Sequence, residues 1–168
     1  MTLDPRRICQ VLLEERVDFV VIGGFAAVVR GSSVVTYDID VIAARAEANL
    51  ERLATALRRL NAQLRTGDEL IPLSVNADFL AQMQVSLNLT TDFGDLDLVF
   101  APAGPKSTYE AWLQEAGEMD LGDSLVVTIA SLADVIASKR AANRPKDAAA
   151  LPALEALYTT ISKSQENS

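Results

Sequence analysis

Apolar and polar residues recur along this chain with two spacings, and these spacings predict its helices and strands. Apolar residues at helical spacing predict helices over 5–16, 24–30, 46–60, 76–83, 108–116, 131–142 and 145–158. Short apolar or alternating runs predict strands over 18–22, 36–43, 85–91, 96–100, 118–121 and 125–129. The stretch 61–76 fits neither spacing clearly. The mixture of helices and hairpins predicts an α/β (α+β) fold.

The segment 20–41, VVIGGFAAVVRGSSVVTYDIDV, carries the first sign of chemistry. Its second predicted strand holds Asp38 and Asp40, whose side chains project from the same face because strand side chains alternate. Adjacent carboxylates repel each other unless a cation lies between them, and Mg²⁺ is held by one or two carboxylates together with substrate phosphates. Gly23 and Gly24 would let the backbone approach a phosphate at the start of the short helix. This segment therefore indicates phosphoryl or nucleotidyl transfer.

A second pair of acidic residues lies on a later predicted strand. The run 85–91 alternates apolar and polar residues, Asp92-Phe93-Gly94 forms a turn, and 96–100 is the antiparallel partner. Asp95 and Asp97 share one face of that partner strand. Two-metal sites need carboxylates that converge from adjacent strands, so this pair could supply a further ligand.

Composition limits the remaining possibilities. The chain has 168 residues and is 49% hydrophobic, which suits one domain with a substantial core. With no histidine, a Ser-His-Asp triad and a His-bound zinc are excluded. The net charge of −8 argues against a broad electrostatic grip on nucleic acid but allows a local basic groove. The single cysteine, Cys9, is expected to be a small buried hydrophobe, and the chain is expected to be cytoplasmic.

Two segments resemble known motifs. The sequence VIGGFAAVVRGSSVVTYDIDV resembles the opening motif of the nucleotidyltransferase (polymerase-beta-like) superfamily: hGGxA, a short helix, a Gly-Ser loop and DxD. The segment SLADVIASKRAANRPKDAAALPALEAL, which starts at Ser131, resembles the helical motif of the AbiEii-like or MenT-like toxin branch, roughly LadLIasKraagRpkDlaDl. The resemblance implies a minimal nucleotidyltransferase fold, with a mixed β-sheet flanked by helices and a C-terminal helical segment. Chain length and the lack of a long linker predict one domain over 1–161, with a core over about 5–130 and helices over about 131–161, and the polar residues 162–168 predict a flexible tail.

The resemblance also assigns the acidic residues. Asp38, Asp40 and most naturally Asp97 would hold Mg²⁺ or Mn²⁺ and act in catalysis, with Asp95 as the alternative third ligand. Ser32 and Ser33, with Gly23 and Gly24, would bind the nucleotide phosphates. For the serine pair, a plain turn is an equally good interpretation.

The late motif supplies the basic residues of the expected nucleotide site. Lys139 would contact the triphosphate, and Arg144 or Lys146 would meet phosphate nearby. Lys139 could instead be an ordinary lysine near a helix C-terminus, and Asp147 could cap its own helix rather than bind nucleotide.

Two positions depart from the motifs. Val34 stands where the first motif often has an arginine, and Ala150 stands where the second often has an acidic residue. Because the acidic triad is intact, activity is still expected, whereas nucleotide choice and substrate binding are the properties these departures affect.

By resemblance, the chain is expected to transfer NMP from an NTP to an RNA acceptor, such as a tRNA 3′ end. It would then be the toxin of a toxin–antitoxin pair, with a cognate antitoxin as partner. One alternative is a nucleotidyltransferase that modifies a small molecule, such as an aminoglycoside, or a protein hydroxyl. Another is a regulatory module that binds nucleotide without catalysis.

Overall fold

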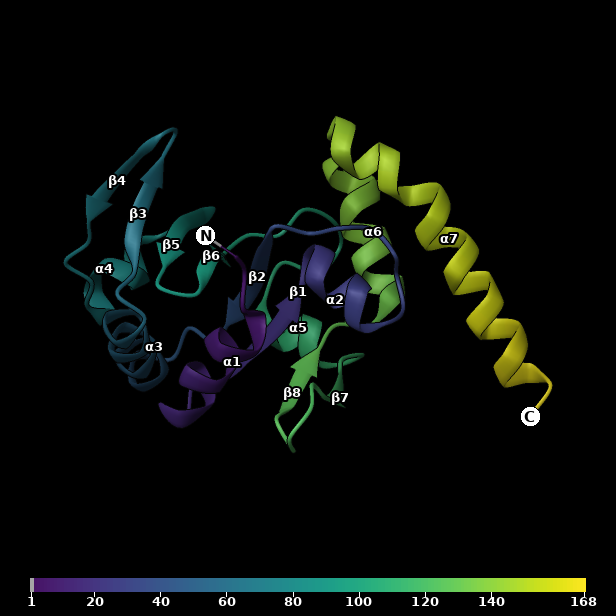
Figure 1. Cartoon of the computed structure of the whole chain (residues 1–168), viewed down its shortest axis with the longest axis horizontal. Helices are drawn as coiled ribbons and strands as arrows, with labels where there is room; N and C mark the ends of the chain where they lie inside the picture. The colour runs from purple at the N-terminus through teal and green to yellow at the C-terminus, as the bar shows by residue number, and fades with distance from the viewer. Residues whose placement is uncertain (1) are drawn as a thin grey trace.

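The computed structural model describes residues 2–168 and contains one eight-stranded mixed sheet with helices around it (Figure 1). The strands are β1 (Phe19–Ile22), β2 (Asp38–Ala43), β3 (Gln63–Thr66), β4 (Glu69–Pro72), β5 (Ser86–Thr91), β6 (Gly94–Val99), β7 (Gly117–Asp120) and β8 (Val126–Ile129). The helices are α1 (Pro5–Glu14), α2 (Gly23–Val29), α3 (Glu47–Arg59), α4 (Ala77–Gln82), α5 (Tyr109–Leu113), α6 (Leu132–Ala142) and α7 (Pro145–Glu166). The predicted α/β fold class is confirmed.

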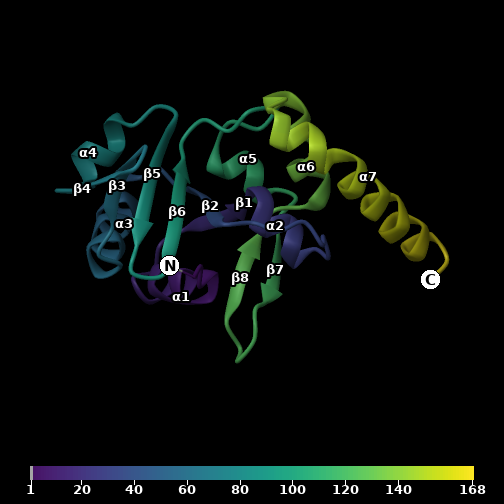
Figure 2. The same ribbon diagram turned by 45° about the horizontal axis from the view of Figure 1, so that its top comes forward.

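The strand order β4-β3-β5-β6-β2-β1-β8-β7 places the two acidic strands side by side in the middle of the sheet (Figure 2). Strand β2 is parallel to β6 and antiparallel to β1. In both acidic strands the aspartates alternate with buried aliphatic residues, namely Ile39 and Val41 in β2 and Leu96 and Leu98 in β6. Burial of these aliphatic residues directs the aspartates of both strands to the opposite face.

Local signals predicted most helix starts correctly. The carboxylate of Asp4 accepts a hydrogen bond from the backbone of Arg7 at the start of α1, and Ser131 does the same for Asp134 in α6. These are N-caps, which satisfy backbone N–H groups that have no partner inside the helix. Cys9 is fully buried in the core, as expected, and burial raises the pKa of its thiol to about 12. None of the helices within residues 2–168 is long and apolar enough to cross a membrane.

Two segments differ from the prediction. The unassigned stretch 61–76 contains the hairpin of β3 and β4, which extends the sheet beyond β5. The last helix continues past its predicted end at residue 158 as far as Glu166, through most of the expected flexible tail. Figure 1 shows the C-terminal part of α7 extending away from the sheet. In this end the hydroxyls of Thr159, Thr160 and Ser164 donate to carbonyls four residues earlier, and only the preceding part of the helix has fully buried residues.

Candidate active site

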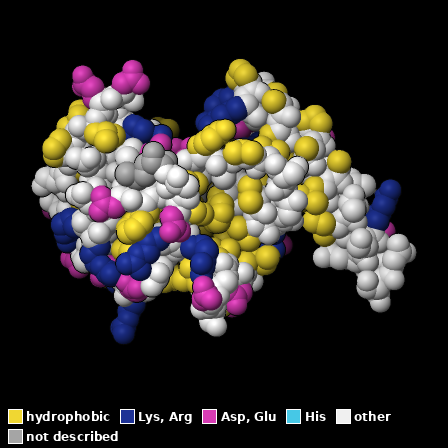
Figure 3. Space-filling model, viewed as in Figure 1, with side chains coloured by type: hydrophobic (Ala, Val, Ile, Leu, Met, Phe, Trp, Pro, Cys, Tyr) yellow, Lys and Arg dark blue, Asp and Glu magenta, His cyan; other side chains and the backbone are white. Residues whose placement is uncertain are grey.

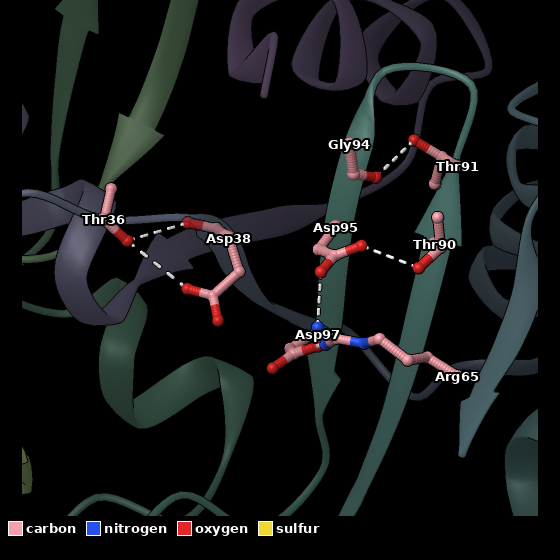
Figure 4. A network of polar contacts seen from close by, with 8 residues as sticks. All are labelled: Thr36, Asp38, Arg65, Thr90, Thr91, Gly94, Asp95 and Asp97. Carbon is pink, nitrogen blue, oxygen red and sulfur yellow. Dashed lines mark hydrogen bonds and ion pairs between the residues drawn. The ribbon is translucent and has the colours of Figure 1, made fainter. Parts of the chain in front are cut away.

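The pairing of β2 with β6 brings the predicted acidic residues together. In this parallel ladder Asp38 lies opposite Asp95, and Asp40 lies opposite Asp97. Asp38, Asp40 and Asp97 all line one cavity of about 460 Å³, and Asp95 does not line it. Figure 4 shows the Asp38 carboxylate beside the Thr36 hydroxyl and the Asp97 carboxylate beside the Arg65 guanidinium.

The other wall of this cavity comes from the C-terminal helices. Lys139 on α6, together with Arg144 and Lys146 where α7 begins, lines the same cavity as the aspartates. The space-filling view shows a hollow between the β3–β4 side of the molecule and the α6–α7 side, with basic side chains at its rim (Figure 3). The cavity therefore presents carboxylates on one wall and cations on the other.

The two glycines of the first motif are packed against the aspartate strand. Gly23 has φ +67°, and a Cβ added there would lie 2.8 Å from the carboxyl carbon of Asp40. A Cβ on Gly24 would lie 3.0 Å from the hydroxyl oxygen of Thr36. Both glycines also line the cavity. Their first structural role is therefore to admit the Asp40 and Thr36 side chains, a close approach that the sequence did not reveal.

Crowding of carboxylates shifts the titration of this site. Burial and the charges of Asp38 and Asp97 raise the pKa of Asp40 to about 7, although the Lys146 and Lys139 charges oppose the shift. Burial also raises the pKa of Asp97 above its usual value, although a hydrogen bond from Asn88 and the charge of nearby Arg65 oppose the shift. Both shifts disfavour the charged form, so the site has excess negative charge that a bound cation would stabilise.

Arg65, which belongs to none of the sequence motifs, contacts the acidic cluster from β3. Its guanidinium donates to Asp95 and, over 2.7 Å, to Oδ1 of Asp97 (Figure 4). The hydroxyl of Thr90 donates a further hydrogen bond to Asp95 over 2.7 Å. The alternation of Gln63, Leu64 and Arg65 before a Gly-Asp turn is a hairpin signal that could have placed this arginine on a strand.

Asp147 joins the two basic residues of the late motif. Its side chain is fully buried, accepts a 2.6 Å hydrogen bond from Arg144 Nε, and lies 3.4 Å from Lys139 Nζ. Burial raises the pKa of Asp147, but the hydrogen bonds and charge of Arg144, with the charge of Lys139, outweigh it and hold the pKa below its usual value. Asp147 also accepts from the Arg144 backbone N–H and so caps α7. It does not line the cavity, which favours the capping interpretation over nucleotide contact.

The two serines do not lie in the cavity wall. Ser32 accepts a hydrogen bond from the backbone of Val34 over 3.1 Å, which is the turn interpretation, and Ser33 is exposed. Val34 and Ala150, the two departures from the motifs, both line the cavity. At Ala150, which is only 9% exposed, an acidic side chain would be buried, so alanine avoids a desolvation cost.

The residues present suit a divalent cation. Asp38, Asp40 and Asp97 offer the carboxylate oxygens that Mg²⁺ and Mn²⁺ prefer. The negative charges of these carboxylates repel one another, and a bound cation would offset that repulsion. Within residues 2–168, no three acidic or cysteine side chains already have their atoms arranged around a common ion position. Binding would therefore require rotamer adjustment of these side chains, which are half-buried.

Comparison with known proteins identifies the class of fold. No protein-family model and no curated protein matches the chain. Among solved structures, the lincosamide antibiotic adenylyltransferase LnuA in its lincomycin-bound form matches with a TM-score of 0.61 and 13% identity, over 93% of this chain and 98% of that chain. ANT(2″)-Ia in complex with adenylyl-2″-tobramycin matches with a TM-score of 0.56 and 14% identity, over 96% of both chains.

A third match is a Thermotoga maritima protein described as a nucleotidyltransferase, with a TM-score of 0.55 and 14% identity over 95% of this chain and 91% of that chain. At these identities the likeness establishes the fold. The chain therefore has the nucleotidyltransferase fold expected from its first motif, over nearly its whole length.

Proposed function

We propose that this protein is a divalent-cation-dependent nucleotidyltransferase that moves NMP from an NTP to a hydroxyl acceptor and releases pyrophosphate. The observation that carries the proposal is the register of β2 with β6, which sets Asp40 beside Asp97 in a cavity whose other wall holds Lys139. A phosphoryl-transfer site needs carboxylates that hold a cation and basic side chains that bind the phosphates.

Each residue has a separate part in the proposed reaction. Asp38, Asp40 and Asp97 would hold Mg²⁺ or Mn²⁺, which when bound supplies positive charge to the reacting phosphate and lowers the pKa of the attacking hydroxyl. Lys139 would bind the triphosphate as a point charge, aided by Arg144 and Lys146.

Buried Asp147 would act through these basic residues. Its contacts with Lys139 and Arg144 restrict their rotamers, so two flexible side chains are held near the cavity before the nucleotide binds. Gly23 and Gly24 would let the polyphosphate approach the backbone at the start of α2, and Ser32 and Ser33 would contact phosphate only after the loop before β2 moves inward.

For the acceptor, we favour an RNA 3′ end, as in the toxin branch that the late motif resembles, with a cognate antitoxin as partner. Two features of the cavity support this choice. Its basic side chains form a local cationic wall in an acidic chain, and Tyr37, 81% exposed, lies beside Asp38 at the cavity. A basic groove with an exposed aromatic ring is the usual surface for an unpaired nucleotide.

A small-molecule acceptor is the second candidate, because two proteins with this fold carry antibiotics or their adenylylated products in their solved structures. The acidic character of the chain suits a cationic aminoglycoside, and the exposed apolar residues Val35 and Val85 at the cavity suit a less polar acceptor.

The test is incubation with each α-³²P-labelled NTP and Mg²⁺, with total tRNA in one series and with tobramycin or lincomycin in another. Asp40→Asn removes one carboxylate of the site, and Asp68→Asn removes an exposed carboxylate in the β3–β4 turn as the matched control. Label on tRNA with wild type and the control, but not with Asp40→Asn, is the expected result.

The other outcomes separate the alternatives. Label on an antibiotic but not on tRNA would replace the RNA acceptor with a small molecule. NTP binding without transfer to either acceptor class or to protein would favour a regulatory module and refute the proposed activity.

A further inference from the structure

Arg65 is a cation of the chain itself that lies against the proposed metal-binding carboxylates. It comes from β3 and reaches across β5 to β6, and one guanidinium group contacts both Asp95 and Asp97 (Figure 4). The three side chains are partly shielded from water, with exposed fractions of 27% for Arg65, 29% for Asp95 and 15% for Asp97. This is therefore a more sheltered contact than an ordinary surface ion pair.

The sheet explains how the contact arises. Gln63 lies opposite Thr90, and Thr90 lies opposite Asp95, so these residues form a row across three strands. Arg65 is two residues beyond Gln63 and shares its face, which is the face that carries Asp97. A guanidinium has donors in a planar fork, so it can contact two carboxylates at once, whereas an ammonium is a single point of charge.

The two aspartates of β6 are left in different situations. Asp95 accepts from both Arg65 and Thr90 and does not line the cavity. Asp97 accepts from Arg65 through Oδ1, lies opposite Asn88 on β5, and lines the cavity beside Asp38 and Asp40. Arg65 thus holds Oδ1 of Asp97 to the sheet, while the Asp97 side chain still lines the cavity.

On this basis, and resting on the proposed function, we propose that Arg65 is a positioning residue that holds Asp97 as the third cation ligand. Asp95 is then the anchor of Arg65 and not itself a ligand. Groups that orient metal ligands through hydrogen bonds typically change metal affinity by about 10- to 100-fold when they are removed. The opposite effect would hold if Arg65 merely competed with the cation, because removing a positive charge would then tighten metal binding.

Mn²⁺ binding tests the two possibilities without relying on turnover. The probe is Mn²⁺ titrated into protein with a non-hydrolysable ATP analogue, with free Mn²⁺ measured by electron paramagnetic resonance. Arg65→Gln is expected to weaken Mn²⁺ binding by about 10- to 100-fold. Arg59→Gln is the matched control, because Arg59 makes ion pairs with Glu14 and Glu15 away from the cavity. Circular dichroism and melting of both variants establish that each is folded.

Three further variants test whether the shape or only the charge of Arg65 matters, and whether Asp97 or Asp95 is the cation ligand. Arg65→Lys keeps the charge but loses the fork, and is expected to bind Mn²⁺ more weakly than wild type. Asp97→Asn is expected to lose Mn²⁺ binding, and Asp95→Asn to weaken it by a smaller factor. Unchanged or tighter binding by Arg65→Gln, wild-type binding by Arg65→Lys, or an Asp95→Asn loss as large as that of Asp97→Asn would each overturn the inference. If wild type itself binds no Mn²⁺, the proposed function fails instead.

Discussion

Replacement of Gly23 by alanine tests how closely the first motif is fitted to the aspartate strand. The backbone at Gly23 has φ +67°, a left-handed conformation that costs an alanine about 1–2 kcal/mol. The new Cβ would also lie 2.8 Å from the carboxyl carbon of Asp40, whereas carbon atoms at optimal separation are about 3.5–4.0 Å apart. The Asp40 carboxyl must therefore move by about 1 Å, and overpacking of this kind costs about 1–3 kcal/mol.

Gly67 provides the matched control. It has φ +60° in the β3–β4 turn, and a Cβ added there would meet nothing within 4 Å. Gly67→Ala should therefore lose only the conformational part, about 1–2 kcal/mol of unfolding free energy. Gly23→Ala should lose the sum of both parts, about 2–5 kcal/mol.

Urea unfolding of both variants measures the difference in stability, and nucleotidyl transfer measures the effect on Asp40. A reacting group misplaced by about 1 Å can lose about 100-fold in rate, so Gly23→Ala should be at least that impaired while Gly67→Ala keeps wild-type activity. If the two variants were equally stable and equally active, the close fit of Gly23 against Asp40 would have no energetic meaning and the reasoning would be refuted.

Three other substitutions test separate parts of the structure. Asp147→Asn leaves Arg144 and Lys139 without their carboxylate and should lower the free energy of unfolding by about 1–3 kcal/mol at pH 7. Because folding lowers the pKa of Asp147, the difference in stability between wild type and variant should shrink as pH falls below about 4, which melts at several pH values measure. Asp40→Asn should raise the melting temperature of metal-free protein at pH 8 but not at pH 4. The pKa of Asp40 is raised to about 7 in the folded state, so wild type loses stability as pH rises toward 7, whereas an asparagine does not ionise. Equal effects at both pH values would contradict this. Trp112→Ala should cost about 3–5 kcal/mol in urea unfolding, since Trp112 is 1% exposed and its Nε1 donates to the carbonyl of Lys106. A loss below about 1 kcal/mol would contradict the importance of this packing.

Much of the secondary structure was predictable because its signals are local. The predicted starts near residues 5, 76 and 131 are correct because Asp4, Asn76 and Ser131 cap these helices, and a capping side chain bonds to the backbone only three residues away. The β3–β4 hairpin was missed because both strands are short and mostly not buried, so their apolar pattern is weak. This omission also hid Arg65.

The candidate site was predictable in part. The aspartates were identified by their spacing, and the chain was assigned to the nucleotidyltransferase fold by resemblance, which the solved structures of that fold confirm. The choice between Asp95 and Asp97, however, depends on which of them faces the cavity, and strand alternation places both on one face. The sequence also could not decide whether Asp147 caps its helix or binds nucleotide. That choice depends on the packing of α7 on α6, which buries Asp147 beside Lys139.

By itself, the sequence determined the faces of the strands, most helix starts and the presence of an acidic motif, since these follow from periods of two and 3.6 residues and from contacts a few residues apart. The tertiary structure decided that β2 lies beside β6 with Asp40 opposite Asp97, that Arg65 approaches them from β3, and that Lys139 faces them across a cavity. The physical reason is that strand order and register are set by burial of the whole sheet, through contacts between residues distant in the chain, and no local pattern encodes them.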